Sequence, residues 1–469
     1  MATADPDPRP ADTTSATPPP ATPPGGLPAR RLALELLRAV LHRRRPLDEA
    51  IEAAGDTTPE GATLAPRDRA FARALAATTL RRLGEIDALI AAVVERPLPR
   101  RAVAARDVLR LGIAQVLMMG TPPHAAVATS VDLVAAVGLE SYKGLVNAVL
   151  RRLQREGADR LAALDGAVLN TPAWLWESWT RAYGEATARA IAAAHLVDPP
   201  LDLTVRGDPA TWARRLEGIV LPTGTVRRAA GGPVADLPGY AGGEWWVQDA
   251  AAALPARLMG DVDGLSVCDL CAAPGGKTAQ LAAAGARVTA VDRSATRLER
   301  LEANLARLGL EAERVVADAT VWEPDAPFDA VLVDAPCTAT GTIRRHPDIP
   351  RLKSADDVAA LAALQRRLLA RAVALVRPGG TIVWCTCSLQ PQEGAVHVDA
   401  LRDQGAPIER VPIDPAEVGG LAESVTRQGD VRTLPCHAAD WGAPPAAEGA
   451  GGIPGGLDGF FIARLRRTA

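Results

Sequence analysis

Several ordinary features are scarce or missing in this sequence of 469 residues. Its apolar runs are short and broken by Arg, Asp, Gly or Pro, and none reaches the roughly 18 uncharged residues that argue for a membrane-spanning helix. The first residues lack the basic-then-apolar layout of a secretory signal, so we expect no such signal. Six cysteines without that signal predict a reducing, cytoplasmic setting, with free thiols or a metal site in place of a disulfide framework.

Lysine is also rare, since only Lys143, Lys277 and Lys353 occur and nearly all positive charge is arginine. The net charge of −3, from 52 basic and 55 acidic residues, argues weakly against a nucleic-acid partner. The average hides an asymmetry. Residues 30–156 hold 20 Lys and Arg against 14 Asp and Glu, a net of +6, which leaves 32 against 41, a net of −9, for the rest. Arginine suits planar recognition of phosphate and bases, although we attribute most of the bias to genomic composition.

What is present is a composition that can fold, with 48% apolar and 23% charged residues. The length predicts roughly two to four domains. Residues 1–26 are rich in Pro, Thr, Ala and Gly and predict a disordered tail. Residues 27–165 repeat apolar side chains at helical spacing and predict a helical bundle, with Pro-containing breaks at 97–99 and 122–123.

Arginine clusters at 43–45, 81–82, 100–101 and 151–152 lie in this bundle. We interpret each cluster by itself as a solvated helix face. Residues 166–262 predict a connecting α+β subdomain with strands at 201–205 and 244–248. Trp174, Trp176 and Trp179 in this subdomain are expected to pack rather than to stack on bases.

From residue 263 to 469 short apolar strands alternate with helices, which predicts a parallel, doubly wound α/β sheet of the Rossmann-like kind. In such sheets, ligands bind beyond the carboxyl ends of the strands. The first strand is followed by a glycine-containing loop, Cys271 to Lys277, that matches neither the dinucleotide nor the phosphate-loop fingerprint. Asp292 and Asp318 end the next two strands, where carboxylates can accept from ribose hydroxyls and from an adenine amino group. Together these features predict an adenosine-containing cofactor.

Two more strand ends carry cysteine. Asp334-Ala-Pro-Cys337 ends the fourth strand and Cys385-Thr-Cys387-Ser ends the fifth, so neighbouring parallel strands would bring Cys337 and Cys387 to one cleft. Cys268-x-x-Cys271 has the spacing of a zinc site. Because Cys268 lies inside a strand and Cys271 beyond its end, the pair should diverge, and we expect no metal.

Five motifs give the chain a resemblance to a known family. They are DLCAAPGGKT (269–278), DAPCTATGTIRRHPDI (334–349), TCS (386–388), WVQD (246–249) and DGFFIARL (458–465). With them, residues 27–469 resemble the bacterial Sun/Fmu-type 16S ribosomal RNA cytosine-C5 methyltransferases of the NOL1/NOP2/Sun superfamily. The helical region is similar to the NusB-like RNA-binding domain of this subgroup. One departure is Gly394, where many relatives have Asn after Glu393.

The resemblance implies S-adenosylmethionine as cofactor and transfer of its methyl group to carbon 5 of a cytosine in small-subunit ribosomal RNA. It implies Cys387 as the nucleophile that adds to carbon 6, Cys337 as its partner and Asp334 at the junction of cofactor and base. It assigns cofactor contacts to Cys271, Ala272, Ala273, Pro274, Gly275, Gly276, Lys277, Asp292, Asp318 and Asp334. We further expect a monomer that binds small-subunit ribosomal RNA and no membrane.

Two other functions stay open at this point. One is methylation of tRNA or DNA cytosine, and the other is a non-catalytic RNA-binding antitermination factor, suggested by the NusB-like region alone. Intact Cys337, Cys387 and Asp334 argue against the second. Arg344 and Arg345 directly follow the Cys337 motif, and we expect them to contact the target or line the cofactor cleft.

Overall fold

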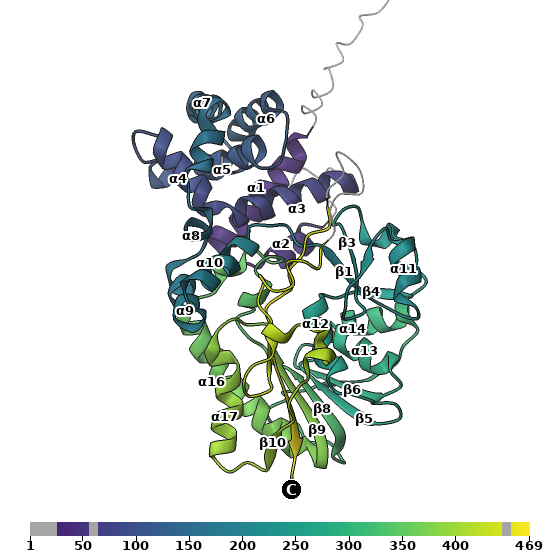
Figure 1. Cartoon of the computed structure of the whole chain (residues 1–469). Coiled ribbons are helices and arrows are strands. Elements are labelled where there is room, and N and C mark those ends of the chain that lie inside the picture. The colour runs from purple at the N-terminus through teal and green to yellow at the C-terminus, as the bar shows by residue number, and fades with distance from the viewer. Residues whose placement is uncertain (1–25, 56–63, 443–451) are drawn as a thin grey trace, which may run out of the picture.

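The computed structural model describes residues 26–55, 64–442 and 452–469. The predicted tail of residues 1–26 therefore lies, apart from its last residue, outside the described residues. Figure 1 shows a helical domain that stands on an α/β domain, with a small second sheet at the side of the latter. None of the helices in the described ranges is both long enough and apolar enough to cross a membrane.

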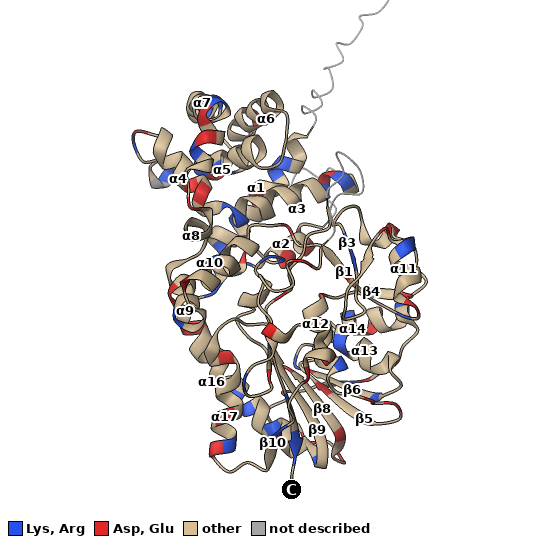
Figure 2. Cartoon of the chain, viewed as in Figure 1, with Lys and Arg blue, Asp and Glu red and all other residues tan. Residues whose placement is uncertain are grey.

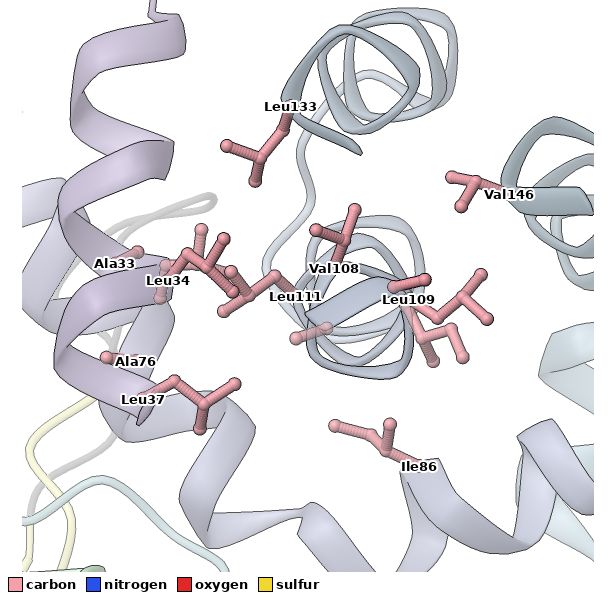
Figure 3. Packing of buried hydrophobic residues seen from close by; sticks show 14 of the residues in the cluster. Ala33, Leu34, Leu37, Ala76, Ile86, Val108, Leu109, Leu111, Leu133 and Val146 are labelled. Atoms are coloured by element: carbon pink, nitrogen blue, oxygen red, sulfur yellow. The ribbon is translucent and has the colours of Figure 1, made fainter. Parts of the chain in front are cut away.

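The helical domain is built around one central helix, α5. Figure 3 shows Val108, Leu109 and Leu111 of α5 surrounded by aliphatic side chains from the neighbouring helices. Val108 and Leu109 are fully buried, as the helical spacing of apolar residues predicts. The helices are α1 (Leu27–Arg43), α2 (Leu47–Ala54), α3 (Pro66–Arg81), α4 (Leu83–Val93), α5 (Val103–Leu117), α6 (Pro123–Ala136) and α7 (Lys143–Ala162).

The next region joins short helices to a small antiparallel sheet of order β2-β3-β1-β4. Trp179 is 1% exposed and packs beside Leu175 and His195, so the expectation of packing is confirmed for this tryptophan. The elements are α8 (Gly166–Asn170), α9 (Ala173–Tyr183), α10 (Glu185–Ala194), β1 (Leu201–Val205), α11 (Pro209–Arg215), β2 (Ile219–Val220), β3 (Val226–Arg228), β4 (Trp245–Val247) and α12 (Ala250–Arg257).

The large sheet has the order β10-β12-β9-β8-β5-β6-β7, with β11 paired to β12. Strands β9, β8, β5, β6 and β7 run parallel, as predicted, whereas β12 pairs antiparallel with β9, β10 and β11. The elements are β5 (Ser266–Leu270), α13 (Gly276–Ala283), β6 (Arg287–Asp292), α14 (Ala295–Leu308), β7 (Glu313–Val316), β8 (Phe328–Asp334), α15 (Ile349–Leu352), α16 (Ala355–Leu375), β9 (Val376–Thr386), α17 (Ala395–Asp403), β10 (Ile408–Arg410), β11 (Val431–Arg432) and β12 (Phe461–Arg467).

Helices cover both faces of this sheet. Val267 of β5 packs in one cluster with residues of α12 and α13, whereas its neighbour Cys268 packs in another cluster with residues of α16. Successive side chains of a strand point to opposite faces, so this split is what a strand buried on both sides requires. The fold is a helical domain, a small α+β region and a Rossmann-like domain, as predicted. The division of the chain at residues 165 and 262 stays a prediction.

The helical domain docks on the segment that follows Cys337. The backbone amide of Leu47 donates to Asp348 Oδ2 at 2.9 Å, and Arg44 Nη2 donates to the Leu352 carbonyl at 2.6 Å. His346 Nδ1 lies 3.3 Å from Asp48 Oδ2. Three contacts, two from α2 and one from the turn between α1 and α2, thus hold residues 346–352 against the helical domain.

Candidate functional site

The two cysteines predicted to share a cleft meet where β8 and β9 end. Asp334, the last residue of β8, pairs with Cys385 of β9, so both following loops start at the same edge of the sheet. The Sγ atoms of Cys337 and Cys387 lie 3.3 Å apart, and both cysteines are free. A disulfide would need about 2.05 Å, so the structure holds two thiols in contact.

A lysine and a carboxylate lie beside the thiols. Lys277 Nζ donates to Asp334 Oδ2 at 2.7 Å, and it lies 5.3 Å from the centre of the Phe460 ring. Burial disfavours the charge of Lys277, but the Asp334 carboxylate outweighs burial and raises the lysine pKa. The opposite edge of Asp334 faces Cys385, whose Sγ is 3.6 Å from Oδ1. Lys277 and Asp334 are both expected near the cofactor, but nothing in the sequence indicates their ion pair.

The glycine-containing loop crosses the end of β5. Cys271 has a φ of 63° and Gly275 a φ of 100°, which are left-handed values that let the chain turn sharply before α13 begins at Gly276. A side chain at Gly275 would collide with Leu301, since an added Cβ would lie 2.7 Å from that residue. The loop is therefore shaped by close packing against α14.

Asp292 ends β6 beside this loop. It is 3% exposed, and it accepts from the backbone amides of Ala273 at 3.3 Å and Ser294 at 3.0 Å. Arg297 Nη1 reaches the same carboxylate at 3.4 Å. Asp318 follows β7, the next strand, and its exposed carboxylate accepts from Thr320, which lowers its pKa. Both acids lie at the predicted strand ends, and their roles stay predictions.

A third acid lies deeper in the same strand layer. Asp269 of β5 is fully buried; its Oδ2 accepts from the Thr278 hydroxyl at 2.6 Å, and its Oδ1 has no partner. Burial raises the pKa of Asp269 to about 7, and the charges of Asp334 and Asp292 act in the same direction. Perturbed acids of this kind cluster at functional sites.

Three cysteines in and near the site have raised pKa values. The contact with Cys387 and burial together raise the pKa of Cys337 well above its usual range. Burial raises the pKa of Cys271 to about 12 and that of Cys268 well above its usual range. In residues 26–55, 64–442 and 452–469, no group of three or more His, Cys, Asp and Glu side chains could hold a metal ion.

Arg344 and Arg345 lie in an ion cluster with the carboxylates of Asp249 and Asp458. Arg344 is 3% exposed, and it donates to Asp249 Oδ2 at 2.5 Å and to Asp458 Oδ1 at 2.6 Å. Arg345 contacts the same two carboxylates and the Pro200 carbonyl at 3.0 Å. The expected contact with target or cofactor is wrong for Arg344, because its guanidinium is buried in an ion cluster. This cluster joins three of the five motifs named above.

The arginine clusters of the helical domain also serve internal contacts. Arg81 is 9% exposed, and it donates to the carbonyls of His195 and Arg344 and pairs with Asp198 at 2.8 Å. Arg82 pairs with Glu85. Figure 2 shows basic and acidic positions interspersed along α7. Arg81 is therefore not part of a solvated helix face. Its positive charge serves contacts between the helical domain and the rest of the chain.

Gly394, the departure from many relatives, lies in tight surroundings. An added Cβ would lie 2.8 Å from Arg432 Nη2 and 3.2 Å from the Phe461 ring. Arg432 lies over that ring, and it donates to the Ser388 carbonyl, directly after Cys387. In this chain an arginine thus fills the space beside the helix start and supports the loop that carries Cys387.

Known proteins resemble both parts of the chain. Residues 258–466 match the 16S rRNA methyltransferase RsmB/F family, and residues 27–155 match the NusB family. Ribosomal RNA small subunit methyltransferase B of Xanthomonas campestris is 36% identical over 83% of this chain and 90% of its own length. The same-named protein of Xylella fastidiosa is 35% identical over 94% and 98%.

Solved structures share the fold. The crystal structure of PH0851 covers 95% of this chain and 99% of its own, with a TM-score of 0.69 and 20% identity. That of NSun6 from Pyrococcus horikoshii with SFG covers 64% and 98%, with a TM-score of 0.50 and 18% identity. These two likenesses bear on the fold alone.

Proposed function

Because the chain belongs to the 16S rRNA methyltransferase RsmB/F family, we propose that it methylates carbon 5 of a cytosine in 16S ribosomal RNA through a covalent cysteine adduct. The observation that carries this proposal is the contact between the Cys337 and Cys387 thiols at 3.3 Å, beside the Lys277–Asp334 pair. An enzyme that acts on ribosomal RNA works where that RNA is assembled, so we expect it in the cytoplasm.

S-adenosylmethionine is the cofactor of this family, and when bound it supplies an electrophilic methyl group on a sulfonium. The residues at the strand ends fit it chemically. Asp292 would accept from the ribose hydroxyls and Asp318 from the adenine amino group, while Cys271 to Lys277 would surround the methionine and ribose portions. An added Cβ at Gly276 would meet only Gln248, at 3.6 Å, so the start of α13 leaves room for close approach.

Cys387 has the task of making carbon 5 reactive. Carbon 5 of cytosine is a poor nucleophile because the ring is aromatic and electron-poor. When the Cys387 thiolate forms a bond to carbon 6, an electron pair moves toward carbon 5 and ring nitrogen 3, and the carbon gains enamine character.

Asp334 and Lys277 would serve the ring nitrogen. Negative charge develops on nitrogen 3 as the adduct forms, and a proton delivered there stabilises it. The Lys277 ammonium holds a proton 2.7 Å from Asp334 Oδ2, so the pair can share it with the base. Release then needs the carbon 5 proton to leave. The electron pair of the broken carbon 5–hydrogen bond rebuilds the double bond between carbons 5 and 6 and expels the Cys387 thiolate, and nitrogen 3 returns its proton to the Lys277–Asp334 pair. Cys337 assists this step, either as the base or by orienting a water.

Replacing each cysteine separates these roles. Cys387→Ala should abolish turnover and leave no covalent complex with RNA. Cys337→Ala should still add and methylate, but elimination stalls, so a methylated RNA–protein adduct survives denaturing electrophoresis. Cys436→Ala, a half-buried free cysteine outside the site, is the matched control and should behave as the wild type. An adduct with Cys387→Ala and none with Cys337→Ala would reverse the roles, as in DNA cytosine methyltransferases.

Mapping 5-methylcytosine in total RNA with and without the gene identifies the substrate. Loss of a single site in the small-subunit RNA supports the proposal. Loss only in tRNA would overturn the ribosomal assignment, and no loss at all in a strain that expresses the protein would favour a binding function of the NusB-like domain.

A further inference from the structure

A buried glutamate joins the two cysteine loops from beneath. Glu393 ends the short helix 391–393 and is fully buried. Its Oε1 accepts from the Thr338 backbone amide at 3.0 Å and from Gln365 Nε2 at 3.0 Å. Its Oε2 accepts from the Ser388 hydroxyl at 2.6 Å and from the Thr338 hydroxyl. One carboxylate therefore accepts four hydrogen bonds.

The partners of this carboxylate are the immediate neighbours of the reactive thiols. Thr338 follows Cys337 directly, and Ser388 follows Cys387 directly. Gln365 Nε2 also donates to the carbonyl of Pro336 at 2.9 Å, which fixes the residue before Cys337. The two loops are 50 residues apart in sequence, so Glu393 provides a bridge that the strands alone do not.

The loops touch each other above this bridge. The Gly341 amide donates to the Cys387 carbonyl at 2.9 Å, and the Leu389 amide donates to the Thr340 hydroxyl at 2.9 Å. The Thr340 and Ser388 hydroxyls lie 3.3 Å apart. The network continues on the far side, where Gln365 Oε1 lies 2.9 Å from His397 Nε2. Burial lowers the pKa of His397 to about 4, so this ring is neutral.

The chemistry of the site favours a carboxylate at this position over an amide. All four donors are neutral groups, and both oxygens of a carboxylate can accept from them. The NH2 group of a glutamine would instead point two hydrogens at the donors on one side. Hydrogen bonds to a buried charge are stronger than those between neutral groups, so the loops are held stiffly.

We propose that Glu393 is a positioning residue that sets the separation of the Cys337 and Cys387 thiols. Carbons 5 and 6 of a cytosine are bonded neighbours, so the groups that serve them must stay close together. The link to catalysis rests on the proposed function, while the effect on the distance between the thiols does not.

The test measures that distance through thiol chemistry. Glutathione disulfide accepts two electrons and two protons from the two thiols, which yields a Cys337–Cys387 bond and two molecules of glutathione. The rate of formation of this bond, followed by peptide mapping with mass spectrometry, reports how often the Sγ atoms meet. The matched experiment measures kcat, the KM for RNA and the affinity for S-adenosylmethionine on the same full-length protein.

In Glu393→Gln we expect the rate of Cys337–Cys387 bond formation and kcat to fall on the order of 10- to 100-fold, because small displacements of reacting groups carry penalties of this size. Affinity for S-adenosylmethionine should stay within about twofold, since none of the hydrogen bonds to the Glu393 carboxylate comes from the loop of residues 271–277. The control is Glu85→Gln. Glu85 lies in the helical domain, is 2% exposed and accepts hydrogen bonds from Arg82 and Asn170. It should leave both rates unchanged.

A folded Glu393→Gln protein with unchanged rates would overturn the proposal. If that variant does not fold, Ser388→Ala removes one donor and keeps the carboxylate. It should slow both processes by a smaller factor, and unchanged rates there would overturn the proposal equally. A slower bond formation in a protein whose wild type methylates no RNA would uphold the positioning role and reject the proposed function.

Discussion

The helical domain and the catalytic domain differ in how their buried polar side chains are grouped. The cluster around α5 that Figure 3 shows is aliphatic, as a well-packed bundle requires, and the buried Asp107 of α5 pairs with Arg110 of the same helix. At the strand ends of the catalytic domain, Asp269, Thr338, Ser388 and Glu393 are all fully buried. Burying such groups costs free energy unless each finds partners, so a dense polar cluster indicates a site that function maintains.

The tryptophans allow the two domains to be observed separately. All nine lie at or beyond residue 174, so tryptophan fluorescence reports on the connecting and catalytic regions. Far-ultraviolet circular dichroism reports on both, with a large contribution from the helical domain. The predictions that follow use this difference.

The largest effect is expected from Arg344→Ala. This change leaves the buried carboxylates of Asp249 and Asp458 with Arg345 as their remaining arginine partner. Removing one partner from a buried ionic cluster typically costs about 3–5 kcal/mol of unfolding free energy. Urea unfolding followed by tryptophan fluorescence measures the loss. Arg344→Lys keeps the charge but not the forked geometry, and it should lose less. A stable Arg344→Ala protein with weakened RNA binding would return this arginine to the target-contact role.

A smaller effect is expected in the aliphatic core. Ile86 of α4 is fully buried, and Ile86→Val removes one methyl group at a cost of about 0.5–1.5 kcal/mol. The loss should appear in circular dichroism and leave the fluorescence transition in place. If the fluorescence transition shifts by the same amount, the two domains unfold as one cooperative unit and the contrast between them fails as a description of stability.

The smallest effect concerns pH at the docking contact. Burial opposes the charge of His346, but its hydrogen bond to Asp48 and the charge of that carboxylate outweigh burial and raise the histidine pKa. A raised folded-state pKa gives stability that is fully present below the unfolded value of about 6.5 and is lost as pH rises through the folded value. Both side chains are about half exposed, so the contribution stays below about 1 kcal/mol.

Comparing the wild type with Asp48→Asn across pH isolates this contribution. The difference in unfolding free energy should be greatest near pH 6 and shrink toward pH 8.5. A difference that grows with pH would contradict the assigned pair. His346→Gln serves as the control, because it removes the titrating group and should flatten the profile.

Strand order explains what the sequence could reveal about the site. The apolar strands that end at Asp334 and just after Cys385 can each be predicted from their own residues. Because neighbouring parallel strands end at one edge of the sheet, the pattern also predicts that Cys337 and Cys387 meet. The helical domain was equally readable, because its apolar spacing is local.

The partners of Arg344 could not be read in the same way. Its carboxylates, Asp249 and Asp458, are 95 and 114 residues away, and nothing local distinguishes a buried arginine from one on an exposed loop. The antiparallel strands β10 and β11 are similarly hidden, since each spans only two or three residues. The bridge through Glu393 depends on hydroxyls that follow each cysteine, and only the folded loops bring them to one carboxylate.

The docking of residues 346–352 on the helical domain bears on the order in which the enzyme is made. The chain emerges from the ribosome with α1 to α7 first, and contacts between neighbouring helices form quickly because little chain separates them. Strands β8 and β9 pair residues that are much further apart in sequence. They can pair only after α16, which lies between them in the chain, has been synthesised. We therefore expect the loop after Cys337 to adopt its final structure late in synthesis, when the helical domain has already folded. In this sense the helical domain serves as a template for the part of the catalytic domain that reaches it.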